Sequence, residues 1–193
     1  MRRIGILGDI GSGKSYIANI FGYPVFNADQ EVGKIYKKNK KVFFKLKKIL
    51  PKYIYSYPIN KYEITNAILA NKSNLKKIIK IVHFEVRKRM QLFLRKNRNK
   101  KFVILDIPLL LENKINKKGD ILIFIDANKN NVLEKLKKRK NFNFELFRKF
   151  KKIQLPLAYK RKKSNFIIRN NFTKKGIKTD IKKILIKILK WRR

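Results

Sequence analysis

The sequence predicts an α/β fold in which a five-stranded parallel sheet carries a phosphate-binding loop. Three observations lead to this prediction. Short apolar runs without polar alternation recur along the chain, as is typical of strands buried on both faces. Segments with helical spacing separate these runs. Four of the eight glycines lie within the first 13 residues, two inside the first apolar run and two just after it.

Five apolar runs, most of them flanked by Asn, Asp or Lys, are the expected strands. They are RRIGILG (2–8), YPVFNAD (23–29), KFVILDIPLLLE (101–112), DILIFIDAN (120–128) and SNFIIRNN (164–171). The strand, glycine-rich loop and helix order at the beginning of the chain makes the first of them the strand that leads into the phosphate loop.

Apolar residues at helical spacing predict the helices. The first follows the loop over 14–22 and closes at Gly22. A long one lies within 71–96, with Ser73 as its expected cap. Residues 132–160 form a helical and strongly basic segment, and the spacing over 179–191 predicts a last amphipathic helix.

The length of 193 residues fits a single domain with an inserted helical region. The order of the predicted elements assigns each part a task. We expect a single domain of this α/β fold over 1–193, with its nucleotide-binding core at 1–29, 101–131 and 161–193, a helical acceptor-binding region at 30–100, and a lid at 132–160.

The formal net charge of +40 would ordinarily indicate binding to nucleic acid or to an anionic membrane surface. The lysines lie all along the chain, however, and the other abundant residues are Asn, Ile, Phe and Tyr, which share codons rich in A and T. Codon drift accounts for such a composition without selection for binding. We therefore expect no specific nucleic-acid partner.

The chain lacks cysteine and has one histidine, which leaves no disulfide and few ligands for zinc. No apolar run approaches the roughly 18 residues of a membrane span. The glycine-rich stretch starts close to Met1, without room for a signal peptide. We expect a cytoplasmic protein without a membrane partner, and its oligomeric state stays open.

The stretch GDIGSGKS matches the phosphate-loop pattern G-x-x-x-x-G-K-[ST] from Gly8 to Ser15. Backbone N–H groups of such a loop surround a phosphate, the lysine reaches the β- and γ-phosphates, and the serine hydroxyl ligates Mg²⁺. Asp9 is unusual because it sets a carboxylate beside an anion site. The expected ATP-binding residues here are Gly8, Asp9, Ile10, Gly11, Ser12, Gly13, Lys14, Ser15 and Tyr16.

Three carboxylates follow strands. Asp29 comes after the second strand, where it could orient or deprotonate an acceptor hydroxyl, or simply cap a helix. Asp106 ends the apolar core of the third strand, where a carboxylate would support Mg²⁺, and Glu112 could bind an acceptor hydroxyl; either could instead be structural. No NKxD guanine motif follows a strand, which argues against a GTPase.

The order of these motifs resembles that of dephospho-coenzyme A kinase from about residue 3 to residue 171. The resemblance is carried by GILGDIGSGKSYIANIFGYPVFNAD, IVHFEVRKRM, LDIPLLLEN, ILIFIDA, LKKRKNF and KIQLPLAYKRKKSNFIIRNN. It implies ATP-dependent phosphorylation of the ribose 3′-hydroxyl of dephospho-coenzyme A, the last step of coenzyme A synthesis, with Mg²⁺ as cofactor.

The same resemblance implies residue roles. Asp29 matches the catalytic aspartate, Lys14 holds the γ-phosphoryl group, and Arg139 matches a lid arginine that neutralises the transferring phosphoryl group. Asn170 falls beside the adenine of ATP, and Ser15 and Asp106 hold the metal. The acceptor-binding positions are Asp29, Lys61, His83, Arg87, Pro108, Leu109 and Glu112.

Five positions depart from the family pattern. They are Asn27 and Asn165 where aspartates are usual, Lys61 and Phe150 where arginines are usual, and Phe84 where a proline is usual. A lysine keeps the charge of an arginine but loses its two-pronged geometry. None of these departures removes the phosphate loop or Asp29.

Two other hypotheses fit parts of the sequence. Another P-loop kinase, acting on a small acceptor such as a nucleoside monophosphate, would carry the same loop. A basic nucleic-acid-binding protein with an ATP loop would explain the charge, and it predicts steeply salt-dependent binding to RNA or DNA.

Overall fold

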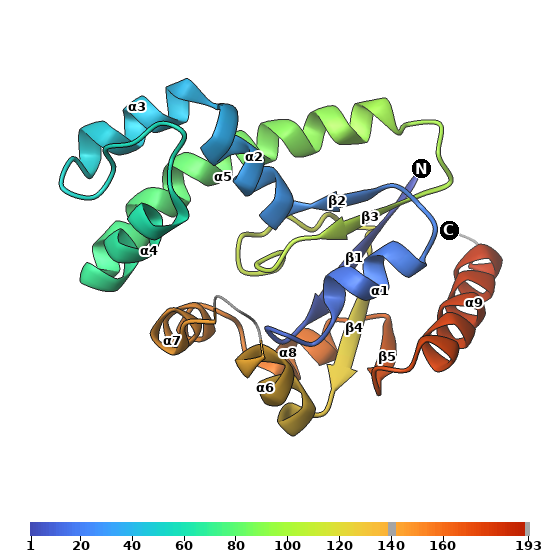
Figure 1. Ribbon diagram of the computed structural model, residues 1–193. Coiled ribbons are helices and arrows are strands. Elements are labelled where there is room, and N and C mark those ends of the chain that lie inside the picture. The colour runs from blue at the N-terminus through green and yellow to red at the C-terminus, as the bar shows by residue number, and fades with distance from the viewer. Residues whose placement is uncertain (139–141, 192–193) are drawn as a thin grey trace. The chain divides into compact units, whose positions relative to one another are not determined.

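Five parallel strands form one sheet in the order β2-β3-β1-β4-β5 (Figure 1). The strands are β1 (Arg2–Gly8), β2 (Val25–Asn27), β3 (Phe102–Asp106), β4 (Ile121–Ala127) and β5 (Phe166–Asn170). The predicted five-stranded parallel sheet is thus confirmed. The apolar runs extend beyond the strands because their ends form turns, such as the one after β3.

The computed structural model describes residues 1–138 and 142–191, except the side chains of 174 and 175. Its internal contacts divide the chain into two units. The sheet unit comprises 1–27, 97–142 and 151–193. The helical unit comprises 28–96 and 143–150, so the division falls inside one helix, α7 (Phe144–Lys152).

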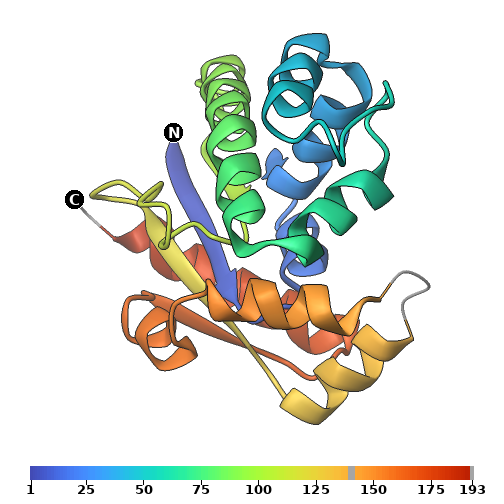
Figure 2. The same cartoon turned by 90° about the vertical axis from the view of Figure 1, so that its left-hand side faces the viewer.

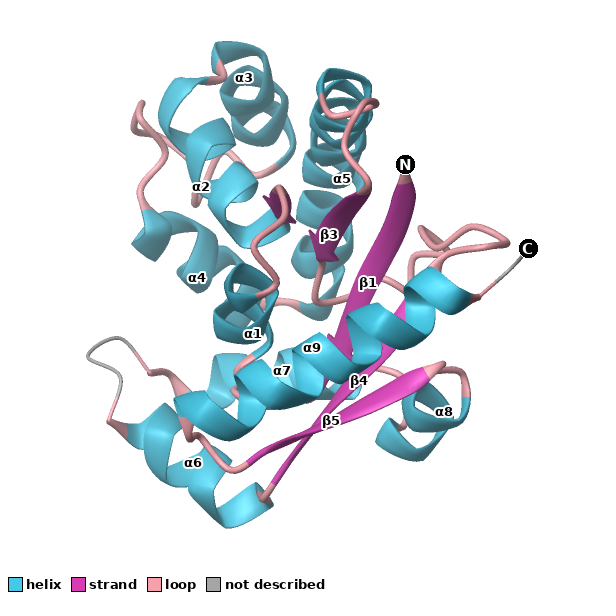
Figure 3. Ribbon diagram, turned by 90° about the vertical axis from the view of Figure 1, so that its right-hand side faces the viewer, coloured by secondary structure: helices cyan, strands magenta, loops and turns pink. Residues whose placement is uncertain are grey.

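In the sheet unit, β1 lies at the centre and pairs with β3 and β4. The helices of this unit are α1 (Lys14–Ile20), α6 (Lys129–Lys137), α8 (Leu157–Lys162) and α9 (Lys174–Lys190). Figure 3 shows α1 and α9 on one face of the sheet and α8 on the other. Helices on both faces explain why the central strands carry apolar residues without alternation.

The core of the sheet unit is built mainly of isoleucine. Ile4 and Ile6 of β1 are fully buried, and Ile17 of α1 and Ile177 of α9 pack in the same cluster. This cluster holds the two helices against the strands, so the loop between β1 and α1 is fixed at both of its ends.

The helical unit contains α2 (Ala28–Lys38), α3 (Lys40–Ile49), α4 (Lys61–Ala70) and α5 (Lys72–Lys96). The first three each contact α5, which has 25 residues and is drawn in green in Figure 2. The predicted cap at Ser73 is wrong. The Ser73 N–H donates to Oδ1 of Asn71 at 2.8 Å, so Asn71 supplies the capping oxygen and the helix begins two residues earlier.

The last helix also begins earlier than its apolar spacing indicates, at Lys174 instead of residue 179. Among the described residues, no helix is both long and apolar enough to cross a membrane.

Candidate functional site

The loop after β1 can be built only with glycine at two of its turns. Gly13 has a φ of 87° in the left-handed region, and a Cβ there would lie 2.5 Å from Nδ2 of Asn170. Gly11 has a φ of 82°, and its Cβ would lie 2.8 Å from Cγ of Leu136 on α6. Side chains therefore fill the outer side of the loop, and the backbone is curled as anion-binding loops require.

Asn170 at the end of β5 holds this loop in place. It is buried, and its amide donates to the Ser12 carbonyl at 2.8 Å. Its Oδ1 accepts the Phe172 N–H, also at 2.8 Å. Both ends of the side chain thus fix the backbone of the loop and of the turn after β5, and its predicted place beside the adenine stays a prediction.

Two lysines meet the loop. Nζ of Lys14 donates to the backbone carbonyls of Asp9 at 2.5 Å and Gly8 at 3.3 Å. Nζ of Lys151, near the end of α7, lies 2.5 Å from Oδ1 of Asp9. The carboxylate that the sequence placed beside the anion site therefore has a cation as its partner. Sequence reasoning missed Lys151, because nothing distinguishes it from its lysine neighbours.

Ser15, Asn27 and Asp106 form a polar cluster at the carboxyl ends of β2 and β3. The Asn27 amide donates to Oδ2 of Asp106 at 2.6 Å and lies 3.4 Å from Oγ of Ser15. Burial raises the pKa of Asp106, while hydrogen bonds from Ser15 and Asn27 and the charge of Lys14 lower it. Asparagine at position 27 therefore serves as a donor to a carboxylate that a second aspartate would repel.

This cluster fits a magnesium ion bound together with a nucleotide. A buried carboxylate and a hydroxyl are hard oxygen ligands, which Mg²⁺ prefers, and substrate phosphates commonly complete its shell. Within residues 1–138 and 142–191, no group of three His, Cys, Asp or Glu side chains could hold a metal alone. The residues thus suit an ion that arrives with phosphate.

Glu112 lies in a second, buried polar cluster. Its Oε1 is 2.7 Å from Nζ of Lys160 and accepts the Leu155 N–H at 3.0 Å. Lys160 also donates to Oε1 of Gln154 at 3.2 Å. Glu112 Oε2 is buried without a hydrogen-bond partner among the described residues. Glu112 thus connects the segment after α7 to the segment after β3, and its contact with the acceptor stays a prediction.

Four predicted acceptor residues lie in the helical unit. Asp29 is exposed in the first turn of α2, and Lys61 is exposed at the first position of α4. His83 and Arg87 are one turn apart on α5. Burial, followed by the positive charge of Arg87, lowers the pKa of His83. A histidine that stays neutral in this way can accept a hydrogen bond from an acceptor molecule.

The structure also places most of the other residues that the sequence analysis named. Pro108 and Leu109 are half-buried in the turn after β3, and Arg139 lies outside the described residues. Phe84, which stands where a proline is usual in the family, lies inside α5. Asn165 accepts the Leu122 N–H at 2.8 Å and donates its own N–H to the Leu122 carbonyl, so the asparagine side chain secures the beginning of β5.

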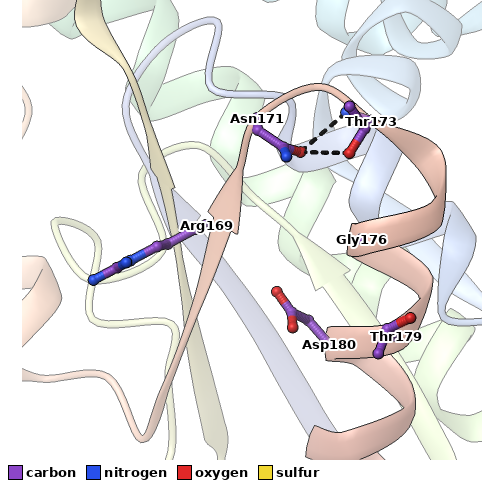
Figure 4. Close-up of a pocket in the computed structure, with 6 residues that line it drawn as sticks. All are labelled: Arg169, Asn171, Thr173, Gly176, Thr179 and Asp180. Atoms are coloured by element: carbon purple, nitrogen blue, oxygen red, sulfur yellow. Dashed lines mark hydrogen bonds between the residues drawn. The ribbon is translucent and has the colours of Figure 1, made fainter.

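A hollow of about 730 Å³ lies beside β5 and α9, and none of the predicted site residues lines it (Figure 4). Its lining comprises Arg169, Asn171, Thr173, Gly176, Thr179 and Asp180. Asn171 accepts hydrogen bonds from both the N–H and the hydroxyl of Thr173, which orders the turn into α9. The lining holds one cation and one carboxylate, so it has no net preference for an anionic ligand.

Comparison with known proteins gives consistent matches. The family model described as dephospho-CoA kinase matches residues 2–175. The chain is 33% identical over 187 residues to a dephospho-CoA kinase of Wolbachia from Brugia malayi, covering 94% of this chain and 95% of the relative. It is 30% identical over 191 residues to that of Rickettsia felis, covering 97% and 98% of the two chains.

Solved structures support the fold. The chain is similar to TT1252 from Thermus thermophilus, with a TM-score of 0.78 and 24% identity over 98% of both chains. It is also similar to a dephospho-CoA kinase from Campylobacter jejuni, with a TM-score of 0.64 and 23% identity over 97% of this chain and 98% of the other.

Proposed function

Because the chain belongs to the dephospho-CoA kinase family, its reaction is the phosphorylation of dephospho-coenzyme A by ATP, and we propose how its residues divide this work. The acceptor atom is the ribose 3′-hydroxyl, and the product is coenzyme A. The single observation that supports the proposal best is the glycine-rich loop beside Ser15 and Asp106, which combines an anion-binding backbone with two hard oxygen ligands.

In this proposal the loop residues 8–16 bind the ATP phosphates. Lys14 leaves its backbone carbonyl partners and reaches the γ-phosphate, where it stabilises charge on the transferring group. Asn170 keeps the loop in shape from behind, through its bond to the Ser12 carbonyl. We also propose that Arg139 adds a second cation at the γ-phosphate.

We propose Ser15 and Asp106 as the magnesium ligands. When bound, Mg²⁺ would neutralise phosphate charge and help to hold the triphosphate. Asn27 keeps the Asp106 carboxylate oriented, because its amide is 2.6 Å from Oδ2. Asp106 must be ionised to act as a ligand, and the donors around it favour that form.

We propose that Asp29 orients or deprotonates the 3′-hydroxyl, and that Lys61, His83, Arg87, Pro108, Leu109 and Glu112 bind the acceptor. Asp29 is exposed, as a group that must meet a substrate has to be. Lys61 and Arg87 offer positive charge to the acceptor's phosphates. Catalysis then consists mainly of positioning and electrostatics.

Mass spectrometry of dephospho-coenzyme A incubated with the purified protein and Mg·ATP tests this proposal. We expect the acceptor to gain one phosphate. Lys14→Ala and Asp29→Asn should each lower kcat at least about 100-fold, because they remove transition-state charge stabilisation and acceptor activation. Their circular dichroism should match that of the wild type.

Lys100→Ala and Glu134→Gln are matched controls, since both side chains are exposed and lie outside the proposed site. Both should keep wild-type turnover. An Asp29→Asn variant that keeps most of the activity removes Asp29 from the mechanism. An acceptor left unmodified by folded wild-type protein contradicts the proposed function itself.

A further inference from the structure

We propose that Lys151 is a positioning residue of the phosphate loop, whose ammonium neutralises the Asp9 carboxylate and thereby allows the loop to accept ATP. This inference rests on the proposed function, because it assumes that ATP phosphates occupy the loop. It assigns a task to two residues that the general phosphate-loop pattern leaves free, since Asp9 stands at a variable position and Lys151 lies outside the pattern.

Asp9 places a negative charge within the loop that must receive an anion. Its Oδ1 accepts the N–H of Ile10 at 2.7 Å, so the carboxylate is held against the loop backbone. Its own carbonyl accepts from Lys14 at 2.5 Å. The chain has 12 acidic residues against 52 basic ones, so a carboxylate at this position stands out. Unpaired, it would repel every phosphate of an incoming nucleotide.

Lys151 removes that repulsion. Its Nζ lies 2.5 Å from both Oδ1 and Oδ2 of Asp9, so one ammonium serves both oxygens of the carboxylate. Both residues belong to the sheet unit. The pair carries no net charge, and the loop then presents its N–H groups and Lys14 to phosphate without a competing anion.

This arrangement makes a prediction that separates neutralisation from simple loss of a lysine. Removing Lys151 leaves the Asp9 carboxylate without a cationic partner and should weaken nucleotide binding. Removing the Asp9 carboxylate as well should restore nucleotide binding, so the double variant should bind ATP better than the variant that lacks Lys151 alone. If Lys151 acted by touching phosphate directly, that contact would still be missing in the double variant, and the recovery would be incomplete.

Isothermal titration calorimetry with Mg·ATP on the full chain tests the proposal. We expect the Kd of Lys151→Met to rise at least about tenfold, because the bare carboxylate faces several phosphate charges. Lys151→Arg should stay within about threefold of the wild type, since it keeps the charge. Asp9→Asn/Lys151→Met should recover to within about threefold. Lys152→Met, at the exposed neighbouring position, is the matched control and should bind as the wild type does.

Steady-state kinetics with dephospho-coenzyme A add a second readout. In Lys151→Met the KM for ATP should rise while kcat at saturating ATP is largely kept, a split that a general loss of folding would not give. A Lys151→Met variant that binds ATP like the wild type, or a double variant as weak as Lys151→Met, overturns the inference alone. Wild-type protein that does not bind Mg·ATP overturns the proposed function, and the inference with it.

Discussion

Two carboxylate–lysine pairs of the sheet unit have the same chemistry in different surroundings. In the loop pair, Asp9 and Lys151, the side chains are 20% and 41% exposed. In the buried pair, Glu112 and Lys160, they are 9% and 1% exposed. The N–O distances are similar, at 2.5 and 2.7 Å. The two pairs therefore differ in their exposure to solvent and not in the distance between their charged atoms.

This difference determines what each pair can do. A buried ion is costly to desolvate, so removing one partner leaves an uncompensated charge that destabilises the fold. A partly exposed pair is solvated and adds little to stability, so its effect is felt mainly by a charged ligand nearby. The buried pair should therefore matter for folding, and the loop pair for nucleotide binding.

The largest expected effect is that of Lys160→Met on stability. It leaves the Glu112 carboxylate buried beside the Leu155 N–H, its one remaining hydrogen-bond donor among the described residues, and we expect a loss of about 3–5 kcal/mol in the free energy of unfolding. Urea denaturation followed by circular dichroism measures the loss. Glu112→Leu/Lys160→Met is the control and should regain most of it, because no charge remains buried. A single variant as stable as the wild type would end the distinction between the pairs.

The fold was more predictable from the sequence than these pairs. The isoleucine-rich runs at 2–8 and 120–128 predict buried strands because both faces of a central strand demand apolar side chains. The loop requires glycine at position 13, because the left-handed φ and the closeness of Asn170 exclude other residues, and this glycine is therefore visible in the sequence. Such requirements are local or periodic, and they leave a mark on the sequence.

The partners within the site leave no such mark. The sequence analysis does not predict Lys151. It singles out the neighbouring Phe150, which stands where an arginine is usual. Asn27 was read as a lost carboxylate, although it donates to Asp106. Both contacts join residues that are far apart in the chain. The contact of Lys151 also depends on which of many lysines reaches the Asp9 carboxylate. Only the folded arrangement decides between them.

A smaller effect on the free energy of unfolding should come from replacing Asp106. This buried carboxylate accepts hydrogen bonds from neutral donors and lies near the charge of Lys14. Since burial raises its pKa, the native state binds the proton more tightly than the unfolded state, and stability falls as pH rises through the interval above 3.8. Asp106→Asn lacks this titration. Its stability relative to the wild type should increase across that interval and then level off, while its turnover is lost.

Denaturant unfolding of Asp106→Asn and wild-type protein at a series of pH values from 4 to 8, about one unit apart, measures this difference. Glu134→Gln, which is exposed, controls for removal of a carboxylate in general. A stability difference that does not change with pH would contradict the raised pKa and place Asp106 with the solvated carboxylates.

The smallest losses in the free energy of unfolding should come from breaking the ion pairs that are most exposed to solvent. Arg161 and Asp126 are 3.2 Å apart with side chains 49% and 35% exposed, and Arg161→Ala should cost no more than about 0.5 kcal/mol. Lys151→Met should cost less than about 1 kcal/mol, between this value and that of Lys160→Met. Repeating the urea denaturations in high salt should shrink both small losses, because salt screens exposed charges, and leave the large one nearly unchanged. If the cost of Lys151→Met instead matched that of Lys160→Met and resisted salt, the loop pair would be part of the structural core, and weaker ATP binding would follow from a loosened loop instead of an exposed carboxylate.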